Sequence, residues 1–340
     1  MAVDLGGRQS KAVHIQRRGE KYTLLNYAIL NVPTEKKVTL EALADHLNGL
    51  SHELGDRTKV VSLALGPNEA LLRHAEMPMV PVADLRSMLK CNAKPHLQQD
   101  LPDHIFDCQF VMPASGNPTN GAAKGASGIQ HHKVLVGGAK RQVIEDLQAA
   151  ARSAGLIPEQ IVPNLTGPAN AFEMAEPEIF AKEIVALVDI GFKSTSISIL
   201  SAGELMLNRV VNIGGDQLTS GLAESLGISY AEAEGIKVGM PAEVQHNLEP
   251  LIIPLGRELR ASIDFFEHQQ DKTVSQVFLS GASARCEFLV TTLQSELMVP
   301  CKTWSPVKFL QLSLPPQKMG ELDQTAPLLT TAVGTALAAF

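Results

Sequence analysis

The sequence predicts an α/β protein built from two domains of related architecture. One observation is its length, because 340 residues exceed what a single hydrophobic core usually organises. A second is the pattern of apolar residues, which switches repeatedly between the alternation of strands and the spacing of helices. The third is a repeat: residues 3–15 and 188–200 each consist of an apolar strand, Asp, one spacer, Gly, a short polar loop and an alternating strand. Two such hairpins far apart in the chain indicate two domains of common origin that face each other.

The first half of the chain alternates short strands with three helices. Gly55 and Gly155 follow helical patterns, and glycine is favoured where a helix ends. The stretch 114–128 is rich in Gly, Ser, Asn and Ala, which predicts a flexible hairpin or loop. We expect strands at 2–5, 12–15, 22–29, 60–65, 106–112 and 133–137, and helices at 40–54, 82–97 and 141–153.

The second half repeats the strand-rich opening and then becomes helical. The C-terminal stretch 326–340 is apolar but shorter than the ~20 residues of a membrane-spanning helix, and three threonines interrupt it. It therefore predicts a buried terminal helix. We expect strands at 184–189, 196–200, 205–211 and 277–279, and helices at 217–226, 230–237, 255–268 and 285–297.

Charge and cysteine content restrict the function classes. The formal net charge is −7 and the sequence pI is about 5.8, which argues against nucleic acid as a partner. The four cysteines have no Cys-x-x-Cys spacing, and no signal peptide is visible at the N-terminus. We therefore expect reduced thiols and a cytoplasmic protein.

Both repeated hairpins suit the phosphates of a nucleotide. Glycine lets backbone N–H groups approach phosphate oxygens closely. An Asp at the end of each first strand, Asp4 and Asp189, can hold hydrated Mg²⁺, which binds proteins through one or two carboxylates. Lys11 can reach the β- and γ-phosphates as a point charge. The paired hairpins therefore predict a site for a Mg²⁺-nucleotide.

These motifs resemble the actin superfamily, which includes Hsp70 and the sugar kinases. Within it the chain is most similar to the PilM family of type IV pilus assembly proteins, and next to the division protein FtsA. The similarity covers nearly the whole chain and is strongest over 184–305. The residues that carry it are Asp4, Gly6 and Lys11 of the first hairpin, Asp189, Gly191 and Thr195 of the second, Gly214-Gly215-Asp216, and the strand and turn 277–282.

The resemblance implies an actin-like (ribonuclease H-like), two-lobed α/β ATPase fold with four subdomains. Subdomain 1A would comprise 1–79, 164–187 and 320–340, and subdomain 1C would be an insertion at 80–163. Subdomain 2A would comprise 188–216 and 277–319, with 2B at 217–276.

The resemblance also implies ATP or ADP between the lobes, with Mg²⁺ at Asp4 and Asp189. Glu234 and Lys237 are three residues apart on one helix face. The resemblance implies that they touch the ribose and adenine; a solvated ion pair within the helix is the alternative. The complete set of implied nucleotide-binding residues is Asp4, Gly6, Gly7, Arg8, Gln9, Ser10, Lys11, Asp189, Gly191, Lys193, Thr195, Gly214, Gly215, Asp216, Glu234, Lys237, Gly281, Ala282 and Ser283.

The partner implied by the resemblance is the cytoplasmic N-terminal tail of a PilN-like inner-membrane pilus protein. It would lie in a groove between 1A and 1C, and the protein would reach the inner membrane only through it. The alternative role for 1C is self-association.

Several positions depart from the superfamily pattern. Phe192 stands near the expected γ-phosphate and offers no hydrogen bond, and Ala282 replaces a glycine of the adenosine turn. No carboxylate occurs in 164–168, where hydrolysing relatives position water. Arg8 and Lys193 can add positive charge at the phosphates. We therefore expect at most slow ATP hydrolysis, and the alternatives are an FtsA-like protein, a sugar or carboxylate kinase, or a scaffold without nucleotide.

Overall fold

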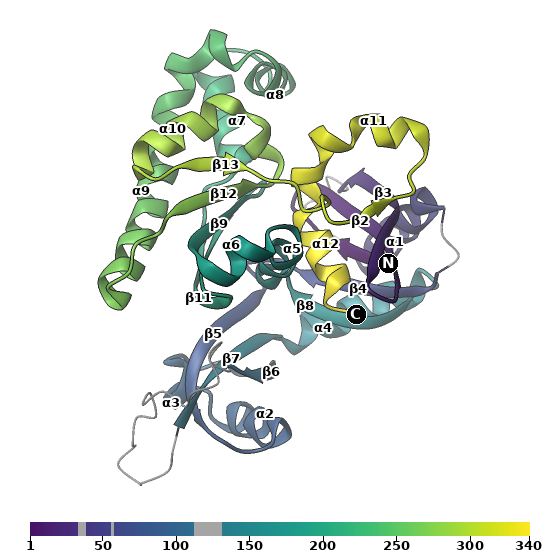
Figure 1. Cartoon of the computed structure of the whole chain (residues 1–340). Coiled ribbons are helices and arrows are strands. Elements are labelled where there is room, and N and C mark those ends of the chain that lie inside the picture. Colours follow the sequence, from purple (N-terminus) through teal and green to yellow (C-terminus); the bar gives the residue numbers. More distant parts are fainter. Residues whose placement is uncertain (33–38, 56–57, 112–130) are drawn as a thin grey trace.

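A computed structural model describes residues 1–32, 39–55, 58–111 and 131–340. Three β-sheets organise the chain, one in each of two lobes and one in a smaller unit that projects from them (Figure 1). The strand orders are β14-β3-β2-β1-β4-β8, β11-β10-β9-β12-β13 and β5-β7-β6. The α/β class and the two-lobed arrangement predicted from the sequence are confirmed.

The six-stranded sheet forms the first lobe. Alternate residues of its strands enter two different cores: Val3 and Ala12 face the helices α1 (Leu40–Leu54) and α4 (Arg141–Ser153), whereas Ala2 and Val13 face the opposite side. Thr39 caps the start of α1, and Gly55 ends it with a positive φ of 63°. The strands are β1 (Ala2–Asp4), β2 (Gln9–Arg18), β3 (Lys21–Asn31), β4 (Val60–Leu65), β8 (Ile157–Pro163) and β14 (Gln311–Leu312).

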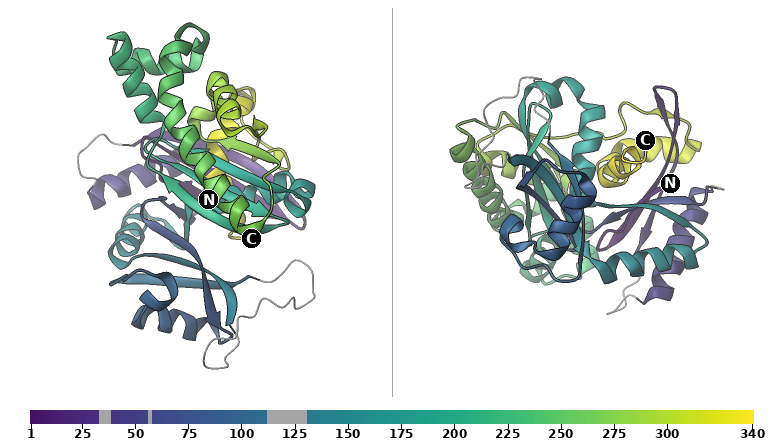
Figure 2. Two further views of the ribbon diagram at one scale, coloured as in Figure 1. Left: turned by 90° about the vertical axis from the view of Figure 1, so that its left-hand side faces the viewer. Right: turned by 90° about the horizontal axis from the view of Figure 1, so that it is seen from below.

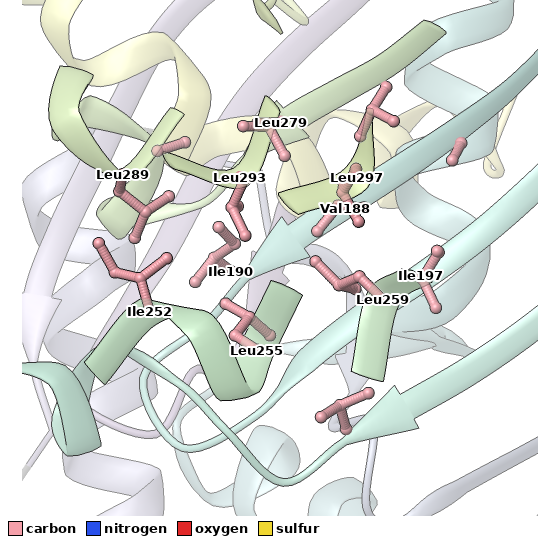
Figure 3. Close-up of a cluster of buried hydrophobic side chains, with 14 of the residues drawn as sticks. Val188, Ile190, Ile197, Ile252, Leu255, Leu259, Leu279, Leu289, Leu293 and Leu297 are labelled. Carbon is pink, nitrogen blue, oxygen red and sulfur yellow. The ribbon is translucent and has the colours of Figure 1, made fainter. Parts of the chain in front are cut away.

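The five-stranded sheet forms the second lobe. One of its faces is covered by the helices α7 (Gly215–Leu226), α9 (Gln245–Gln270) and α10 (Glu287–Leu297). Figure 3 shows the aliphatic side chains of this core, with Val188 and Ile190 from the sheet facing Leu255 and Leu293 from the helices. The strands are β9 (Ile184–Ile190), β10 (Thr195–Ser201), β11 (Glu204–Val211), β12 (Gln276–Ser280) and β13 (Cys301–Thr303).

The two lobes share a core formed around the helices α5 (Gly167–Ala175) and α12 (Thr330–Leu337), which lie between the two sheets (Figure 1). Phe172 of α5 packs edge-on against Phe278 of β12 and against Trp304, with ring centroids 4.6 and 5.2 Å apart. The terminal helix is buried over all of its residues 330–336, as predicted.

α5 and α12 cross at two glycines. A Cβ on Gly334 would overlap the carbonyl oxygen of Gly167, and one on Gly167 would lie 3.0 Å from the Thr331 backbone. Asn170 Nδ2 donates to the Gly334 carbonyl at 3.2 Å, which fixes the same crossing. The absence of side chains at these two positions therefore sets the distance between the helices.

The third sheet belongs to a unit inserted between β4 and β8 (Figure 2). One of its faces packs on α2 (Val82–Cys91), and the short helix α3 (Lys94–Leu97) follows. The single helix expected over 82–97 is thus wrong, because the Pro95 ring would clash with the carbonyl of Cys91 in a continuous helix. The expected loop at 114–128 lies outside the described residues. The strands are β5 (Ala70–Pro78), β6 (His104–Phe110) and β7 (His131–Lys140).

Four strands were not predicted, namely β5, β8, β13 and β14, and the first two affect the domain division. β5 begins at Ala70, before the start of the insertion expected at residue 80. β8 lies inside the expected insertion 80–163, yet it pairs with β4 in the six-stranded sheet. Pro158 and Pro163 obscured β8, which is an edge strand and so tolerates them. The division into four subdomains stays a prediction.

The remaining helices are α6 (Pro177–Lys182), α8 (Tyr230–Gly239) and α11 (Pro316–Thr325). α9 begins ten residues before the expected start and continues through Pro250 and Pro254. α10 begins at Glu287, because a 3-10 turn, η3 (Ala282–Arg285), precedes it. Among the described residues, no helix is both long and apolar enough to cross a membrane.

Replacing Gly334 by Ala should destabilise the protein by about 2 kcal/mol or more, because the new methyl group overlaps the Gly167 carbonyl. Gly320→Ala in α11 is the matched control, since its Cβ meets nothing within 4 Å and Ala favours the helix. Urea unfolding of both variants measures the difference. Equal stability of the two variants would contradict the tight crossing.

Candidate functional site

The loops of the two repeated hairpins face each other across the lobes. A Cβ on Gly7, between β1 and β2, would lie 3.5 Å from the Phe192 ring, between β9 and β10. The Arg8 guanidinium lies 5.7 Å from the centroid of the same ring. The predicted meeting of the hairpins is therefore present in the structure. We use the term cleft for the region where the two loops, α8 and η3 meet.

Two carboxylates lie at the base of the cleft. Asp4 is buried at the end of β1, and its Oδ2 is 3.3 Å from Lys11 Nζ on the antiparallel partner strand. Asp189 near the end of β9 accepts a hydrogen bond from Ser280 Oγ at 3.1 Å. Burial raises the pKa of Asp189 to about 6, the charge of Asp4 adds to the increase, and Lys11 and Ser280 oppose it. The two carboxylates thus interact electrostatically, as a shared cation site would require.

Backbone crowding at the loops explains two of the predicted glycines. A Cβ on Gly191 would lie 2.8 Å from the Ser194 carbonyl oxygen. Gly281 has φ of 88°, and a Cβ there would lie 2.9 Å from Asp189 Oδ1. Only glycine fits this conformation and this closeness to the carboxylate.

The second hairpin is fixed to the start of α7. The amides of Gly215 and Asp216 donate to the carbonyls of Gly191 and Phe192 at 2.9 and 2.8 Å. Thr195 is fully buried, and its hydroxyl donates to the Ile213 carbonyl at 2.7 Å. A Cβ on Gly215 would lie 2.5 Å from Ser283 Oγ, so the Gly-Gly-Asp turn and the η3 turn also meet. Thr195 therefore connects the second hairpin to the segment before α7 and has a structural role.

Glu234 and Lys237 form a buried network with Thr219. Lys237 is 3% exposed, and its Nζ lies 2.8 Å from Glu234 Oε2 and 2.7 Å from Thr219 Oγ1. Burial acts to raise the pKa of Glu234, but the hydrogen bonds from Lys237 and Thr219 outweigh it and leave the pKa lowered. The ion pair within the helix, which was the alternative, is present, but it is not solvated at Lys237, which is enclosed.

The other predicted residues of the first loop differ in their surroundings. Gln9 Nε2 donates to Asn31 Oδ1 at 3.2 Å, and Lys193 in the opposite loop is exposed. Ser10 is fully buried, and its hydroxyl has no hydrogen-bond partner among the described residues. An unpartnered buried hydroxyl in this hairpin is a group that a bound polar ligand could satisfy.

Tyr230, which the sequence analysis did not include, completes the cleft. Its hydroxyl accepts from Arg8 Nη1 at 3.1 Å and donates to Asp216 Oδ1 at 3.1 Å. The capping box formed by Ser229 and Glu232 starts α8 directly before it and so places its ring over the cleft. The capping box was visible in the sequence, but the partner across the cleft was not.

A second candidate site is a groove between the third sheet and the first lobe. It consists of two adjoining cavities of about 440 and 600 Å³ that share Val162 and Pro163. His74, Gln109 and Leu135 form one row across the sheet face that lines it, on the side opposite α2. β6 and β8, both edge strands, contribute to the smaller cavity.

The groove ends at the β10–β11 turn of the second lobe. There Lys133 Nζ of β7 lies 2.5 Å from Glu204 Oε1 of β11 and 3.7 Å from Met206 Sδ. His74 lies beside this pair, and burial, together with the charge of Lys133, lowers its pKa to about 4. Its Nε2 is buried without a partner among the described residues. The groove therefore contacts both lobes and the third sheet.

The described residues contain no group of three or more His, Cys, Asp or Glu side chains suited to holding a metal. A cation at Asp4 and Asp189 would therefore complete its coordination with water or phosphate oxygens, which is the usual mode of Mg²⁺. The acidic pair, Lys11, and the glycines that leave room at Gly191 and Gly281 together fit a Mg²⁺-polyphosphate.

Comparison with known proteins decides the family. The model of the type IV pilus assembly protein PilM family matches residues 2–340. The chain belongs to the PilM family. Its structure is similar to the PilM–PilN type IV pilus biogenesis complex, with a TM-score of 0.82, 23% identity, and coverage of 99% of this chain and 97% of that one.

More distant relatives share the actin-like fold. The ethanolamine utilization protein EutJ from Carboxydothermus hydrogenoformans has a TM-score of 0.55 at 17% identity, covering 99% and 88% of the two chains. MreB5 of Spiroplasma citri bound to ADP has a TM-score of 0.52 at 10% identity, covering 99% and 94%. The cell division protein FtsA of Bacillus subtilis (strain 168) is 21% identical over 258 residues, or 70% of this chain and 57% of FtsA. The chain thus spans little more than half the length of that relative.

The PilM-family assignment confirms the predicted family and fold, and the cleft brings most of the predicted residues together. The two Asp-Gly hairpins, the turn at 214–216, Glu234 with Lys237, and the turn at 281–283 all border it. Their roles toward a nucleotide stay predictions.

His74 should make the stability of the protein fall as the pH decreases. Its pKa is about 4 when folded and near 6.5 when unfolded, so the unfolded chain takes up a proton first between these values. His74→Gln should remove this pH dependence. On lowering the pH from 7.5 to 4.5, the free energy of unfolding of the variant should therefore rise by about 2 kcal/mol relative to that of the wild type. The exposed His52→Gln is the control. Parallel pH curves for His74→Gln and wild type would contradict the burial of a neutral imidazole.

Proposed function

We propose that this PilM-family chain is a nucleotide-binding scaffold for type IV pilus assembly. It binds ATP or ADP with Mg²⁺ in the cleft and holds the cytoplasmic tail of a PilN-like inner-membrane protein in the groove. The observation that carries the proposal is the meeting of the two hairpins, with Asp4, Asp189 and Lys11 at their base. The protein works by presenting surfaces in a ligand-dependent arrangement.

The nucleotide is assigned from the chemistry of the cleft. Lys11 and the loop amides supply positive charge and N–H donors for the phosphates, and the two carboxylates supply ligands for Mg²⁺. A divalent cation would also offset the repulsion that raises the pKa of Asp189. Glu234 and Lys237 border the ribose and adenine side, where their buried network presents a fixed carboxylate.

Hydrolysis is at most slow. Phe192 presents an apolar ring in the second loop, and no carboxylate follows β8 to position an attacking water. Asn164 has a buried Oδ1 without a partner among the described residues, but an amide is a weak base. A kinase role is disfavoured for the same reason.

The partner is assigned to the groove because two strands that end their sheets, β6 and β8, and one face of the third sheet line it. An extended peptide can pair its backbone with the edge of β6 or β8 and place alternate side chains in the two cavities. The similarity to the PilM–PilN complex supports a PilN-like partner. Recruitment to the inner membrane then follows from that partner, and the chain itself works on the cytoplasmic side.

The subdomains follow the three sheets. We assign the first sheet with α1, α4, α5 and α12 to 1A, the second sheet to 2A, and α7–α9 to 2B. The third sheet is 1C, for which residues 70–140 describe the inserted unit better than 80–163.

Asp4→Ala and Asp189→Ala should each weaken binding of Mg²⁺-ADP by ~1–3 kcal/mol, because a charged contact to the cation is lost. Isothermal titration calorimetry measures this, with Asp271→Ala at the end of α9, outside the cleft, as control. No heat with millimolar ATP or ADP would remove the nucleotide from the proposal.

Phosphate release from ATP by the wild type should stay well below ~10 s⁻¹.

Leu135→Asp should weaken capture of a synthetic PilN-like cytoplasmic tail peptide at least tenfold, because it places a charge at the one apolar position of the row, between His74 and Gln109. Met79→Asp, at a side chain 64% exposed after β5, is the control. Point variants are needed because deletion of 82–162 would remove β8 from the first sheet. If Leu135→Asp instead changes only the oligomeric state, the third sheet mediates self-association and the groove assignment fails.

A further inference from the structure

Arg8 connects the two lobes across the mouth of the cleft. It belongs to the loop before β2 in the first lobe, where its backbone carbonyl accepts a hydrogen bond from Val32 N at 2.8 Å. Its side chain, in contrast, contacts residues of the second lobe. Its Nη1 donates to Tyr230 at 3.1 Å and lies 3.9 Å from Glu234 Oε2. Its guanidinium also lies 5.1 Å from the centroid of the Tyr230 ring and 5.7 Å from that of Phe192.

These contacts form a chain of matched donors and acceptors. Arg8 donates to the Tyr230 hydroxyl, and that hydroxyl donates to Asp216 at the first turn of α7. Burial raises the pKa of Tyr230, so the phenol keeps its proton at neutral pH and remains a donor. The two aromatic rings flank the guanidinium and add cation–π attraction to the hydrogen bond.

Arg8 also affects the group assigned to the ribose. Glu234 Oε2 already lies within hydrogen-bond distance of Lys237 and Thr219, and Arg8 is the third positive or donor group around it. A ribose hydroxyl that bonds to this carboxylate would compete with Arg8 for Glu234 Oε2.

We propose that Arg8 is an interlobe latch, which holds the lobes together through Tyr230, Phe192 and Glu234 and which an adenosine moiety must displace. The inference rests on the proposed nucleotide cleft and adds regulation to it. The latch holds the lobes in this arrangement without a nucleotide. It also lowers the affinity of the cleft for the adenosine moiety. Phosphates open the latch, because they can replace Tyr230 and Glu234 as partners of the Arg8 guanidinium.

The test uses adenosine, because it lacks the phosphates that would attract Arg8. In the full-length protein, Arg8→Ala should bind adenosine about 3- to 10-fold more tightly than wild type, since the ligand no longer competes with exposed ion-pair and cation–π contacts. Tyr230→Phe, which keeps the ring and loses the hydroxyl, should shift the affinity less in the same direction. Arg17→Ala is the matched control, because Arg17 lies over the Tyr22 ring and its contacts stay within the first lobe.

A second measurement requires no ligand. Arg8→Ala should increase the radius of gyration in small-angle X-ray scattering and speed amide exchange in the loops at Gly7 and Phe192, whereas Arg17→Ala should change neither.

Weaker adenosine binding by Arg8→Ala would make Arg8 a ligand contact and overturn the latch. Unchanged scattering and exchange would overturn it as well. Failure of wild type and Arg8→Ala alike to bind adenosine, ADP or ATP would count against the nucleotide cleft, and the scattering and exchange data would still decide the latch.

Discussion

The crossing of α5 and α12 at Gly167 and Gly334 is the contact on which the rest of the arrangement depends. Both helices lie between the two large sheets, and the core around them contains Val13 from the first lobe and Leu187 from the second. A wider crossing would separate the sheets and so move the two hairpin loops apart. The close approach of Gly7 to Phe192 therefore depends on two positions more than 150 residues apart that have no side chain.

Charge is distributed unevenly in the cleft that this crossing creates. The base holds two interacting carboxylates with one lysine, whereas the mouth holds Arg8 between two aromatic rings. The base favours a cation and polyphosphate, and the mouth is already occupied by a side chain of the protein. The proposed nucleotide site and the proposed latch therefore rest on different parts of the same cleft.

The cleft and the groove are joined by one strand. β10 begins at Thr195 beneath the second hairpin and ends at Ser201 beside the groove, and all seven of its residues are buried. At about 3.3 Å per residue, the two sites lie ~20 Å apart along a single rigid element. The Lys133–Glu204 ion pair links the next strand, β11, to the third sheet. The third sheet is thereby attached to both lobes.

The resemblance to a known family identified most of the residues that border the cleft. The sequence by itself determined the α/β class, the duplicated hairpins, and the helix ends at Gly55 and Gly155. These depend on local pattern: alternation, helical spacing, and glycine where the backbone requires it. Burial of the C-terminal helix also followed from composition. Local pattern failed at β8, because its two prolines argue against a strand unless it is known to be an edge.

The tertiary structure alone decided which groups meet across the lobes. Whether Lys237 was solvated depended on packing between α7 and α8, and the partner of Arg8 depended on where α8 begins relative to a loop 222 residues earlier. The raised pKa of Asp189 likewise needs both Asp4 nearby and the exclusion of water. The groove has no sequence motif, because it is formed by one face of a small sheet, two edge strands and a turn of the other lobe. Such features depend on distances between segments, and a sequence specifies those distances only through the complete fold.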